Sequence, residues 1–592
     1  MSPATLALAL ALAAAPAPSP LGPILSLPPR DALPPPLPAP DALLGADGGA
    51  AEDGGEGSAV EAPLPAPDDP LEFLYAHRIN FAAEGAPLVT VRLMEGQDEV
   101  QLSGETPLSI ALRGAGEKRV GVPAGVSIRL RVVRSKPARL RFFAQVADLS
   151  YRDRAGVSAA RALWERRGEV VTARTLGTVY GIAGRVLDNR RTLLLLGEGG
   201  DRGDAQGRLD ALRRRYGIAG SLHEELIDRP QGEVEIADGS SGGVVAASSE
   251  VAVIEAEGQG AIDVRGVEFG MGYAFHGRAD RRYRGRLFAA VDRDGKLAIV
   301  EALPLEELLR GLVPSEIFSS SPPEALRAQA VTARGEVLAK IGARHLTDPY
   351  LLCAEQHCQV YSGLGGERKT TDDAVLATRG EALFSRAGLL VDSVYSAVCG
   401  GHTEDNEVVW GGPPDPSLRG VTDLLEGSLA RGPGRSEASV RRWIASEPAA
   451  FCHLPDRSGP ARYRWSRRFG AAELDGLLAG LAVGRLRALV PRDRGVSGRA
   501  ATLEVVGERG TAEVHGELVI RKLLQNLASS AFVVDVEPGP DGHPAAFTLR
   551  GAGWGHGVGM CQTGAIGRAQ RGQSYREILR HYFNGAEIAR VY

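Results

Sequence analysis

The sequence predicts a multidomain α+β protein in which small strand-rich modules precede a mixed α/β domain. The chain has 592 residues and 44% hydrophobic content, enough to bury several cores of ordinary size, so two to four domains are expected. Short runs with the two-residue alternation of strands are followed by segments with the 3.6-residue period of amphipathic helices. The formal net charge of -5 gives no global reason to expect a nucleic-acid partner.

The first twenty residues have the pattern of a secretory signal. An apolar run from Leu6 to Leu12 is followed by small residues and prolines. The run is too short to cross a bilayer, and no later stretch of about eighteen apolar residues follows it. We therefore expect a signal peptide over residues 1–20, export to the periplasm or cell envelope, and no integral membrane span.

The next segment, residues 21–70, consists mainly of Pro, Ala, Gly and acidic residues. From Asp31 to Pro70 it holds nine acidic residues and no basic one. Such a composition buries too little apolar surface to offset chain entropy, so we expect a disordered linker.

Residues 71–135 are expected to form a small β module. Two of its runs, Val89 to Leu93 and Ile128 to Val132, alternate between apolar and polar side chains over most of their length. This period of two is typical of half-buried strands.

Residues 136–230 show a strand–helix–strand–strand–helix–strand order. In the second helix a single face carries the apolar positions, Ala205, Leu209, Leu212 and Tyr216. This βαββαβ order is typical of ferredoxin-like modules and resembles a SPOR domain, a family that binds glycan strands stripped of their peptides. A generic α+β spacer is the alternative.

The remaining residues, 231–592, are expected to form the principal domain. Strands run from Glu233 to Val300, and an amphipathic helix is expected to end before Val313, because a residue that precedes proline is disfavoured in the helical region. Glu316 would then lie on a connection. A second helix is expected after Ser321 as N-cap, with Glu324 completing a capping box.

Glu316 is a candidate general acid. It is followed by Ile317 and Phe318, and burial among apolar groups raises the pKa of a carboxyl towards neutrality, as a proton donor needs. A single Glu near a helix end is, however, more often a cap or a surface charge.

The C-terminal half resembles the SpoIID/LytB family. The similarity covers roughly Tyr283 to Tyr592, and ordered motifs carry it: Leu303 to Glu316, Ala325 to Arg334, Cys358 to Tyr361, Ala377 to Glu381, Gly400 to Thr403, Trp410-Gly411, Gly553 to Gln562 and Ile578 to Phe583. The resemblance implies a SpoIID-like mixed α/β catalytic domain and a peptidoglycan lytic transglycosylase, with Glu316 as the only acid/base. It would cleave the MurNAc–GlcNAc bond and leave 1,6-anhydroMurNAc ends.

Several polar and aromatic residues in these motifs are candidates for binding the glycan. Side chains that both donate and accept hydrogen bonds, and aromatic faces, suit sugars. The candidates are Gln359, Tyr361, Ser396, Gly400, Gly401, His402, Thr403, Trp410, Trp554 and His556. Each of them is at least as often structural, and the two tryptophans more often fill a core.

Four potential zinc ligands occur within fourteen residues. His345, Cys353, His357 and Cys358 offer two imidazoles and two thiolates, the donor set of a closed tetrahedral site, so a structural Zn²⁺ is expected. Some members of the resembled family carry such a zinc. A Cys353–Cys358 disulfide is the alternative in an oxidising compartment. Two of the remaining cysteines, Cys399, Cys452 and Cys561, would then be able to pair.

Two other functions remain open. The LytB resemblance suggests a non-catalytic glycan-binding protein that activates a separate cell-wall amidase, which would then be its partner besides peptidoglycan. A zinc-dependent peptidase or amidase would need an open metal position and a separate base, and the His/Cys cluster offers neither in an obvious way.

Overall fold

The computed structural model describes residues 69–592, apart from residues 83–84, 114–117, 183–184, 217–219, 272–275, 356, 427–431, 455–459 and 541. The expected signal peptide, and the expected linker up to residue 68, lie outside the described residues. The described part is a mixed α/β structure, as predicted. Within it, no helix combines the length and the apolar character needed to cross a membrane.

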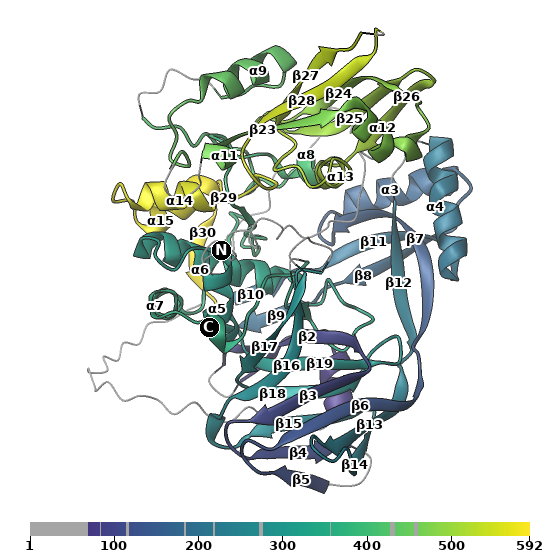
Figure 1. The fold of residues 1–592 in the computed structure, drawn as a ribbon, viewed down its shortest axis with the longest axis vertical. Coiled ribbons are helices and arrows are strands. Elements are labelled where there is room, and N and C mark those ends of the chain that lie inside the picture. Colours follow the sequence, from purple (N-terminus) through teal and green to yellow (C-terminus); the bar gives the residue numbers. More distant parts are fainter. Residues whose placement is uncertain are drawn as a thin grey trace, which may run out of the picture.

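Two antiparallel sheets occupy the lower half of Figure 1. The first has the order β1-β2-β19-β18-β15-β4-β5, and β20 pairs in parallel with β2. Its strands are β1 (Asn80–Phe81), β2 (Pro87–Gln97), β4 (Leu108–Leu112), β5 (Lys118–Val122), β15 (Val251–Ala256), β18 (Arg286–Val291), β19 (Leu297–Pro304) and β20 (Leu352–Cys353). A short helix, α2 (Pro70–Tyr75), contacts β15.

The second sheet has the order β14-β13-β6-β3-β16-β17. Its strands are β3 (Glu99–Gly104), β6 (Ser127–Lys136), β13 (Gln231–Asp238), β14 (Val244–Ser249), β16 (Ile262–Phe269) and β17 (Gly277–Tyr283). Buried apolar residues from both sheets belong to one continuous hydrophobic core, which extends into the helical centre of the molecule.

The strands expected as a separate module over residues 71–135 are shared between these two sheets. Val132 on β6 pairs with Val234 on β13, and Thr90 on β2 pairs with Ala302 on β19. Residues 71–135 and 231–304 therefore form one unit, contrary to the expected boundary. The alternating pattern predicts that a strand has a buried face, but it does not reveal which distant strand pairs with it.

The segment between β6 and β13 is inserted into this unit. Its elements are β7 (Arg139–Ser150), α3 (Arg154–Arg166), β8 (Val171–Leu176), β9 (Val179–Ile182), β10 (Arg185–Asp188), β11 (Arg191–Gly200), α4 (Arg202–Tyr216) and β12 (Ser221–Asp228). The sheet order is β12-β7-β11-β8, with β9 and β10 as a separate hairpin. The expected βαββαβ order is present, and the SPOR resemblance stays a prediction.

Helices form the centre of the molecule. The long helix α6 (Pro323–Lys340) contacts α5 (Leu305–Glu316), α7 (Lys369–Ala377), α14 (Gln562–Ala569) and α15 (Tyr575–Tyr582). Figure 1 shows α14 and α15, from the end of the chain, beside α6. Two small pairings complete the region, β21 (Glu381–Phe384) with β30 (Glu587–Arg590) and β22 (Tyr395–Ser396) with β29 (Met560–Cys561).

Two local expectations in this region are wrong. Helix α5 continues through Pro314 and ends at Glu316, so Glu316 is the last helical residue. Packing explains this, because Leu312, Val313 and Glu316 are all buried in the last turn. Helix α6 begins at Pro323 with Pro322 as N-cap and no side-chain cap, whereas the Glu324 carboxylate accepts a hydrogen bond from the backbone N–H of Tyr575.

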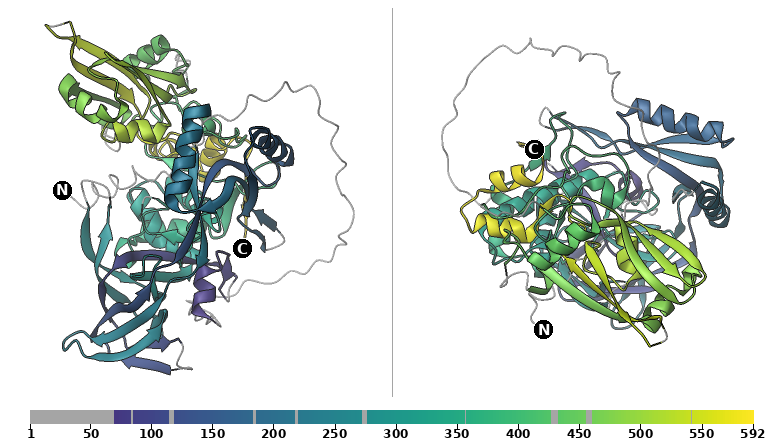
Figure 2. Two further views of the ribbon diagram at one scale, coloured as in Figure 1. Left: turned by 90° about the vertical axis from the view of Figure 1, so that its right-hand side faces the viewer. Right: turned by 90° about the horizontal axis from the view of Figure 1, so that it is seen from above.

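A separate lobe lies at the top of Figure 1 and projects from the helical centre in Figure 2. It has a hydrophobic core of its own. Its elements are β23 (Arg464–Gly470), α12 (Ala471–Leu477), β24 (Leu486–Arg494), β25 (Ala500–Gly507), β26 (Gly510–His515), α13 (Glu517–Leu523), β27 (Phe532–Pro538) and β28 (Pro544–Ala552). Helices α8 (Asn406–Trp410), α9 (Glu437–Ser446) and α11 (Pro460–Tyr463) flank it.

Candidate functional site

Three segments converge on Glu316. Its side chain, at the end of α5, has only 1% of its surface exposed. The backbone N–H of Val360 donates to Oε1 of Glu316 across 3.2 Å, and Nε2 of Gln562 donates to the main-chain oxygen of Glu316 across 2.8 Å. Residues 44 and 246 positions away along the chain therefore hold this glutamate in place.

The surroundings of the Glu316 carboxyl favour its protonated form. Burial raises its pKa to about 8, and the negative charge of Glu336 adds to this effect. The Val360 N–H, Lys340 and Tyr395 act in the opposite direction. The site thus holds a carboxylic acid with a proton to donate, the property expected of a general acid.

Glu336 is the neighbouring carboxylate, and it is already engaged. Its Oε1 accepts from Nζ of Lys340 at 2.5 Å, and its Oε2 accepts from Nε2 of Gln359 at 2.9 Å. Lys340 also donates to the main-chain oxygen of Cys358 at 2.6 Å. All of these side chains are buried, so Glu336 is part of a fixed network and not a second free acid/base.

Several buried polar atoms around Glu316 have no hydrogen-bond partner of ordinary geometry among the described residues. They are Oε2 of Glu316, the hydroxyl of Tyr395, Nε2 of Gln329, Oε1 of Gln359 and Oε1 of Gln562. The Tyr395 hydroxyl is nevertheless close enough to lower the pKa of Glu316. Because buried polar atoms are normally paired, this concentration of unpaired donors and acceptors marks the region as unusual.

His556 supports the strand that carries Tyr395. Its Nδ1 accepts from the backbone N–H of Val558 at 3.1 Å, so the proton is on Nε2, which donates to the main-chain oxygen of Tyr395 at 2.8 Å. Burial lowers the pKa of His556 to about 3, which keeps the ring neutral. The Trp410 ring lies 5.1 Å from the His556 ring. Both residues were predicted to contact the glycan. In the structure they pack against each other, and His556 is bonded to β22.

Other predicted glycan contacts are spread over the region. Tyr361 is buried, and Gly311 gives it room, since a Cβ at Gly311 would lie 2.6 Å from its ring. Gly400 and Gly401 adopt positive φ angles of 81° and 101°. The neighbouring His402 forms a β-bridge with Thr422, and the backbone N–H of Thr403 donates to the main-chain oxygen of Val421. Of the predicted contacts, Gln359, next to Val360, and His556, through Tyr395, belong to the surroundings of Glu316.

A cavity of about 610 Å³ lies at the base of the lobe. Trp554, a predicted glycan contact, lines it together with Trp465, Arg464, Arg467 and Asn526. Glu316 does not line this cavity, but Trp554 pairs through its backbone with Val398, two residues beyond Ser396. The backbone of Trp554 is therefore bound to the segment that follows β22.

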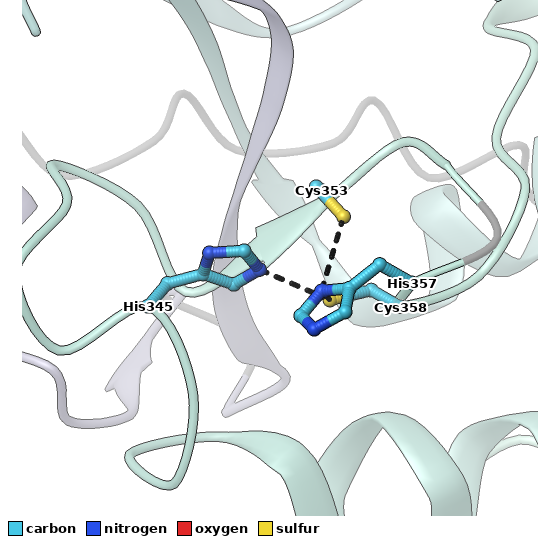
Figure 3. A group of neighbouring side chains, drawn as sticks. All are labelled: His345, Cys353, His357 and Cys358. Carbon is cyan, nitrogen blue, oxygen red and sulfur yellow. Dashed lines mark hydrogen bonds between the residues drawn. The ribbon is translucent and has the colours of Figure 1, made fainter. Parts of the chain in front are cut away.

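The four predicted zinc ligands come together as Figure 3 shows. One ligand atom from each of His345, Cys353, His357 and Cys358 lies within 4.8 Å of all the others. Nε2 of His345 is 3.3 Å from Sγ of Cys358, and Nδ1 of His357 is 3.8 Å from Sγ of Cys353. Both cysteines are free thiols in this structure.

This arrangement fits a tetrahedral metal ion. Zinc–nitrogen and zinc–sulfur bonds of about 2.0 and 2.3 Å place neighbouring ligand atoms roughly 3.5–3.8 Å apart. Nδ1 of His345 faces Oδ2 of Asp348 at 3.1 Å, the carboxylate contact that commonly orients a metal-binding imidazole. The four side chains could therefore hold a tetrahedral metal ion, with all four positions supplied by protein.

Several residues of the site are not evident from the sequence. Tyr395, Gln329, Glu336, Lys340 and Gln562 approach Glu316 or its immediate partners. The only available signal was position, since Gln562 ends one of the quoted motifs and Tyr395 precedes Ser396. Trp465 was missed as well, because its cavity forms only when distant strands of the lobe meet.

Two family models match the chain. The model described as stage II sporulation protein (SpoIID) matches residues 293–384, which include α5, α6 and the His/Cys cluster. A domain of unknown function (DUF8618) matches residues 404–559, which include most of the lobe.

The chain is also similar to curated proteins over about half of its length. An uncharacterized protein of Brachyspira hyodysenteriae is 28% identical over 49% of this chain and 68% of its own length. The stage II sporulation protein D of Bacillus amyloliquefaciens is 28% identical over 49% of this chain and 75% of its own length. The amidase enhancer of Bacillus subtilis is 24% identical over 47% of this chain, and the match covers only 40% of that protein.

Proposed function

Because the chain belongs to the SpoIID/LytB family, we propose that it is a peptidoglycan lytic transglycosylase in which Glu316 is the only acid/base. The observation that carries the proposal is the state of Glu316. It is a buried carboxyl with a raised pKa, at the end of the Leu303 to Glu316 segment that carries the family resemblance.

The proposed reaction needs one carboxyl group. Glu316 donates its proton to the glycosidic oxygen between MurNAc and GlcNAc, and the bond from that oxygen to the anomeric carbon breaks. The C6 hydroxyl of the same MurNAc attacks the anomeric carbon, and the Glu316 carboxylate takes its proton. The acid is regenerated, a 1,6-anhydro ring is formed and no water is consumed. Hydrolases with two carboxylates instead activate water or form a glycosyl-enzyme.

The surroundings of Glu316 are consistent with a reaction that uses a single carboxyl group. Glu336 is held by Lys340 and Gln359 and is therefore poorly placed to act as a nucleophile or base. Tyr395, Gln329 and Gln562 are hydrogen-bonding side chains beside Glu316 that sugar hydroxyls can contact. Glu316 is only 1% exposed. A glycan strand would therefore reach its carboxyl only after the segments that cover it separate. Such closed sites strengthen charge interactions by excluding water.

The closed site also favours a second candidate function. A protein that binds glycan strands without cutting them, and activates a cell-wall amidase, needs no access to Glu316. The cavity lined by Trp465 and Trp554 would then be the principal glycan contact. The amidase enhancer of Bacillus subtilis is the relative whose name suggests this role. Under this alternative, replacement of Glu316 leaves the function intact.

We further propose that His345, Cys353, His357 and Cys358 hold a structural zinc ion. Zinc would supply a rigid cross-link here, since four protein ligands leave no position for a substrate or water. The loop that it fixes continues to Val360, whose N–H holds Glu316. The cluster would thus position the acid without taking part in the chemistry.

The cellular setting follows from the proposed substrate. Peptidoglycan lies outside the cytoplasmic membrane, which agrees with an exported protein in the periplasm or cell envelope. The inserted βαββαβ unit, residues 139–228, is proposed as a SPOR-like module that binds peptide-free glycan.

The decisive experiment compares the wild-type protein with Glu316→Gln. The variant keeps the size of the side chain and removes the transferable proton. We expect the wild-type protein to release anhydro-disaccharide products from purified glycan strands and the variant to release none. Unchanged release would contradict the catalytic role. If Glu316→Gln releases no product but still binds glycan, Glu316 is needed for the reaction and not for binding.

A further inference from the structure

A second group of potential metal ligands lies in the core between β22, β29 and the lobe. It consists of Cys399, Asp423, Cys452 and Cys561. One ligand atom from each lies within 4.8 Å of all the others, and all four residues are buried. All three cysteines are free. We propose that these four residues bind a second zinc ion, distinct from that of the His/Cys cluster and independent of the proposed enzymatic function.

The distances suit tetrahedral coordination. Sγ of Cys399 lies 3.5 Å from Sγ of Cys452 and 3.5 Å from Oδ2 of Asp423. Zinc–sulfur bonds of about 2.3 Å and zinc–oxygen bonds of about 2.0–2.2 Å separate ligand atoms by roughly 3.5–3.8 Å. Three thiolates and one carboxylate form a closed site, and soft sulfur donors select zinc over magnesium or calcium.

The surroundings prepare Asp423 to coordinate through one oxygen. Its Oδ1 accepts from the Tyr582 hydroxyl at 2.8 Å and from the Arg568 guanidinium at 3.0 Å. Its Oδ2 remains directed towards Cys399. Such outer contacts orient metal ligands in characterised sites, and the guanidinium offsets part of the negative charge of the ligand set.

The surroundings of Cys561 favour a thiolate. Its Sγ accepts from the backbone N–H of Cys399 at 3.1 Å and from that of Gly564 at 3.3 Å. Cys561 is also the N-cap of α14, where the helix dipole favours negative charge. Gly564 permits this approach, because a Cβ there would collide with the Asp423 carboxylate and the Tyr582 hydroxyl.

A disulfide between Cys399 and Cys452 is the competing outcome. It would use two of the four converging groups and leave Cys561 and the free oxygen of Asp423 buried beside it. Zinc uses all four. The arrangement as a whole therefore favours the metal.

The second zinc would hold together segments that are far apart in the sequence. Cys399 and Cys561 are 162 residues apart. Cys399 follows β22, and Cys561 is the last residue of β29, the strand that pairs with β22. Gln562, next to Cys561, donates to Glu316. The ion would thus fix the segment from which Gln562 reaches Glu316.

The test measures zinc by elemental analysis in the full-length protein, purified without chelator. The double variant Cys353→Ser with Cys358→Ser removes the first cluster and is expected to retain about one zinc per chain. Replacing this zinc with Co²⁺ should give strong thiolate-to-metal charge-transfer absorption. Cys452→Ser is the reciprocal variant and should hold about one zinc fewer than the wild-type protein.

Thiol counting keeps the test decisive if Cys452→Ser does not fold. The wild-type protein is denatured in the presence of a chelator and alkylated. Mass spectrometry should then find Cys399, Cys452 and Cys561 modified. A Cys399–Cys452 disulfide in the purified protein would overturn the proposal. So would absence of zinc from the double variant, or equal zinc in Cys452→Ser and the wild-type protein.

Discussion

The backbone N–H of Val360 donates to the Glu316 carboxyl across 3.2 Å, and Val360 lies two residues after Cys358. One short segment therefore joins the candidate acid to the His/Cys cluster. Lys340 reinforces the connection, because it pairs with Glu336 and donates to the main-chain oxygen of Cys358. The His/Cys cluster and the position of the candidate acid are therefore physically coupled.

The first prediction concerns the stability of Glu316→Gln. Burial raises the folded-state pKa of Glu316 to about 8, above its value in the unfolded chain. The folded protein therefore binds the extra proton, and wild-type stability falls as pH rises from the unfolded pKa to about 8. Gln does not titrate, so the variant should gain relative stability by up to about 1.4 kcal/mol per pH unit in this window.

Urea denaturation of both proteins at about pH 5 and about pH 8 measures this difference. The same pKa predicts that wild-type activity falls as pH rises above about 8, because the acid loses its proton. A stability difference between the two proteins that does not change with pH would contradict the buried, protonated carboxyl.

The second prediction concerns His556→Ala. The substitution leaves the Tyr395 carbonyl and the Val558 N–H without their partner, and each unpaired buried group costs about 1–3 kcal/mol. We expect a loss of about 2–5 kcal/mol in the free energy of unfolding and lower activity. His556→Gln, which can both donate and accept, is the matched control and should lose less. Equal stability of His556→Ala and the wild-type protein would exclude this supporting role.

The third prediction concerns removal of metal from the His/Cys cluster. Cys358→Ser should lose about one zinc per chain, melt at a lower temperature and release fewer products, because the loop that carries Val360 is no longer cross-linked. Wild-type zinc content in Cys358→Ser would argue against the site.

The fourth prediction concerns the cavity of about 610 Å³. If it binds glycan, Trp465→Ala should weaken binding to insoluble peptidoglycan about two- to tenfold, the effect of losing one aromatic contact. Trp410→Ala is the matched control, because Trp410 packs against His556 and does not line the cavity. Co-sedimentation measures both, and equal binding by Trp465→Ala and the wild-type protein would exclude the cavity as a glycan site.

Local patterns predicted much of this structure from the sequence. The helix stripe at Ala205, Leu209 and Leu212 is buried as expected, and the βαββαβ order is present. The family resemblance is confirmed, and the four clustered zinc ligands converge because they are close in sequence. Whether they bind zinc stays a prediction.

Long-range relationships were beyond such patterns. Gln562 reaches Glu316 from 246 positions away, and nothing in its own segment reveals this contact. Cys399, Cys452 and Cys561 were considered only as partners for a disulfide, because their wide spacing matches no metal motif. Pro314 was expected to end α5, but burial of the last turn outweighs the local cost of proline.

Mass spectrometry of the products released from peptide-free glycan strands tests the central claim most directly. An anhydro end and a hydrolysed, reducing end differ by one water molecule. The account predicts anhydro ends with the wild-type protein and no soluble product with Glu316→Gln. Reducing ends from the wild-type protein, or anhydro ends in equal amount from the variant, would contradict it.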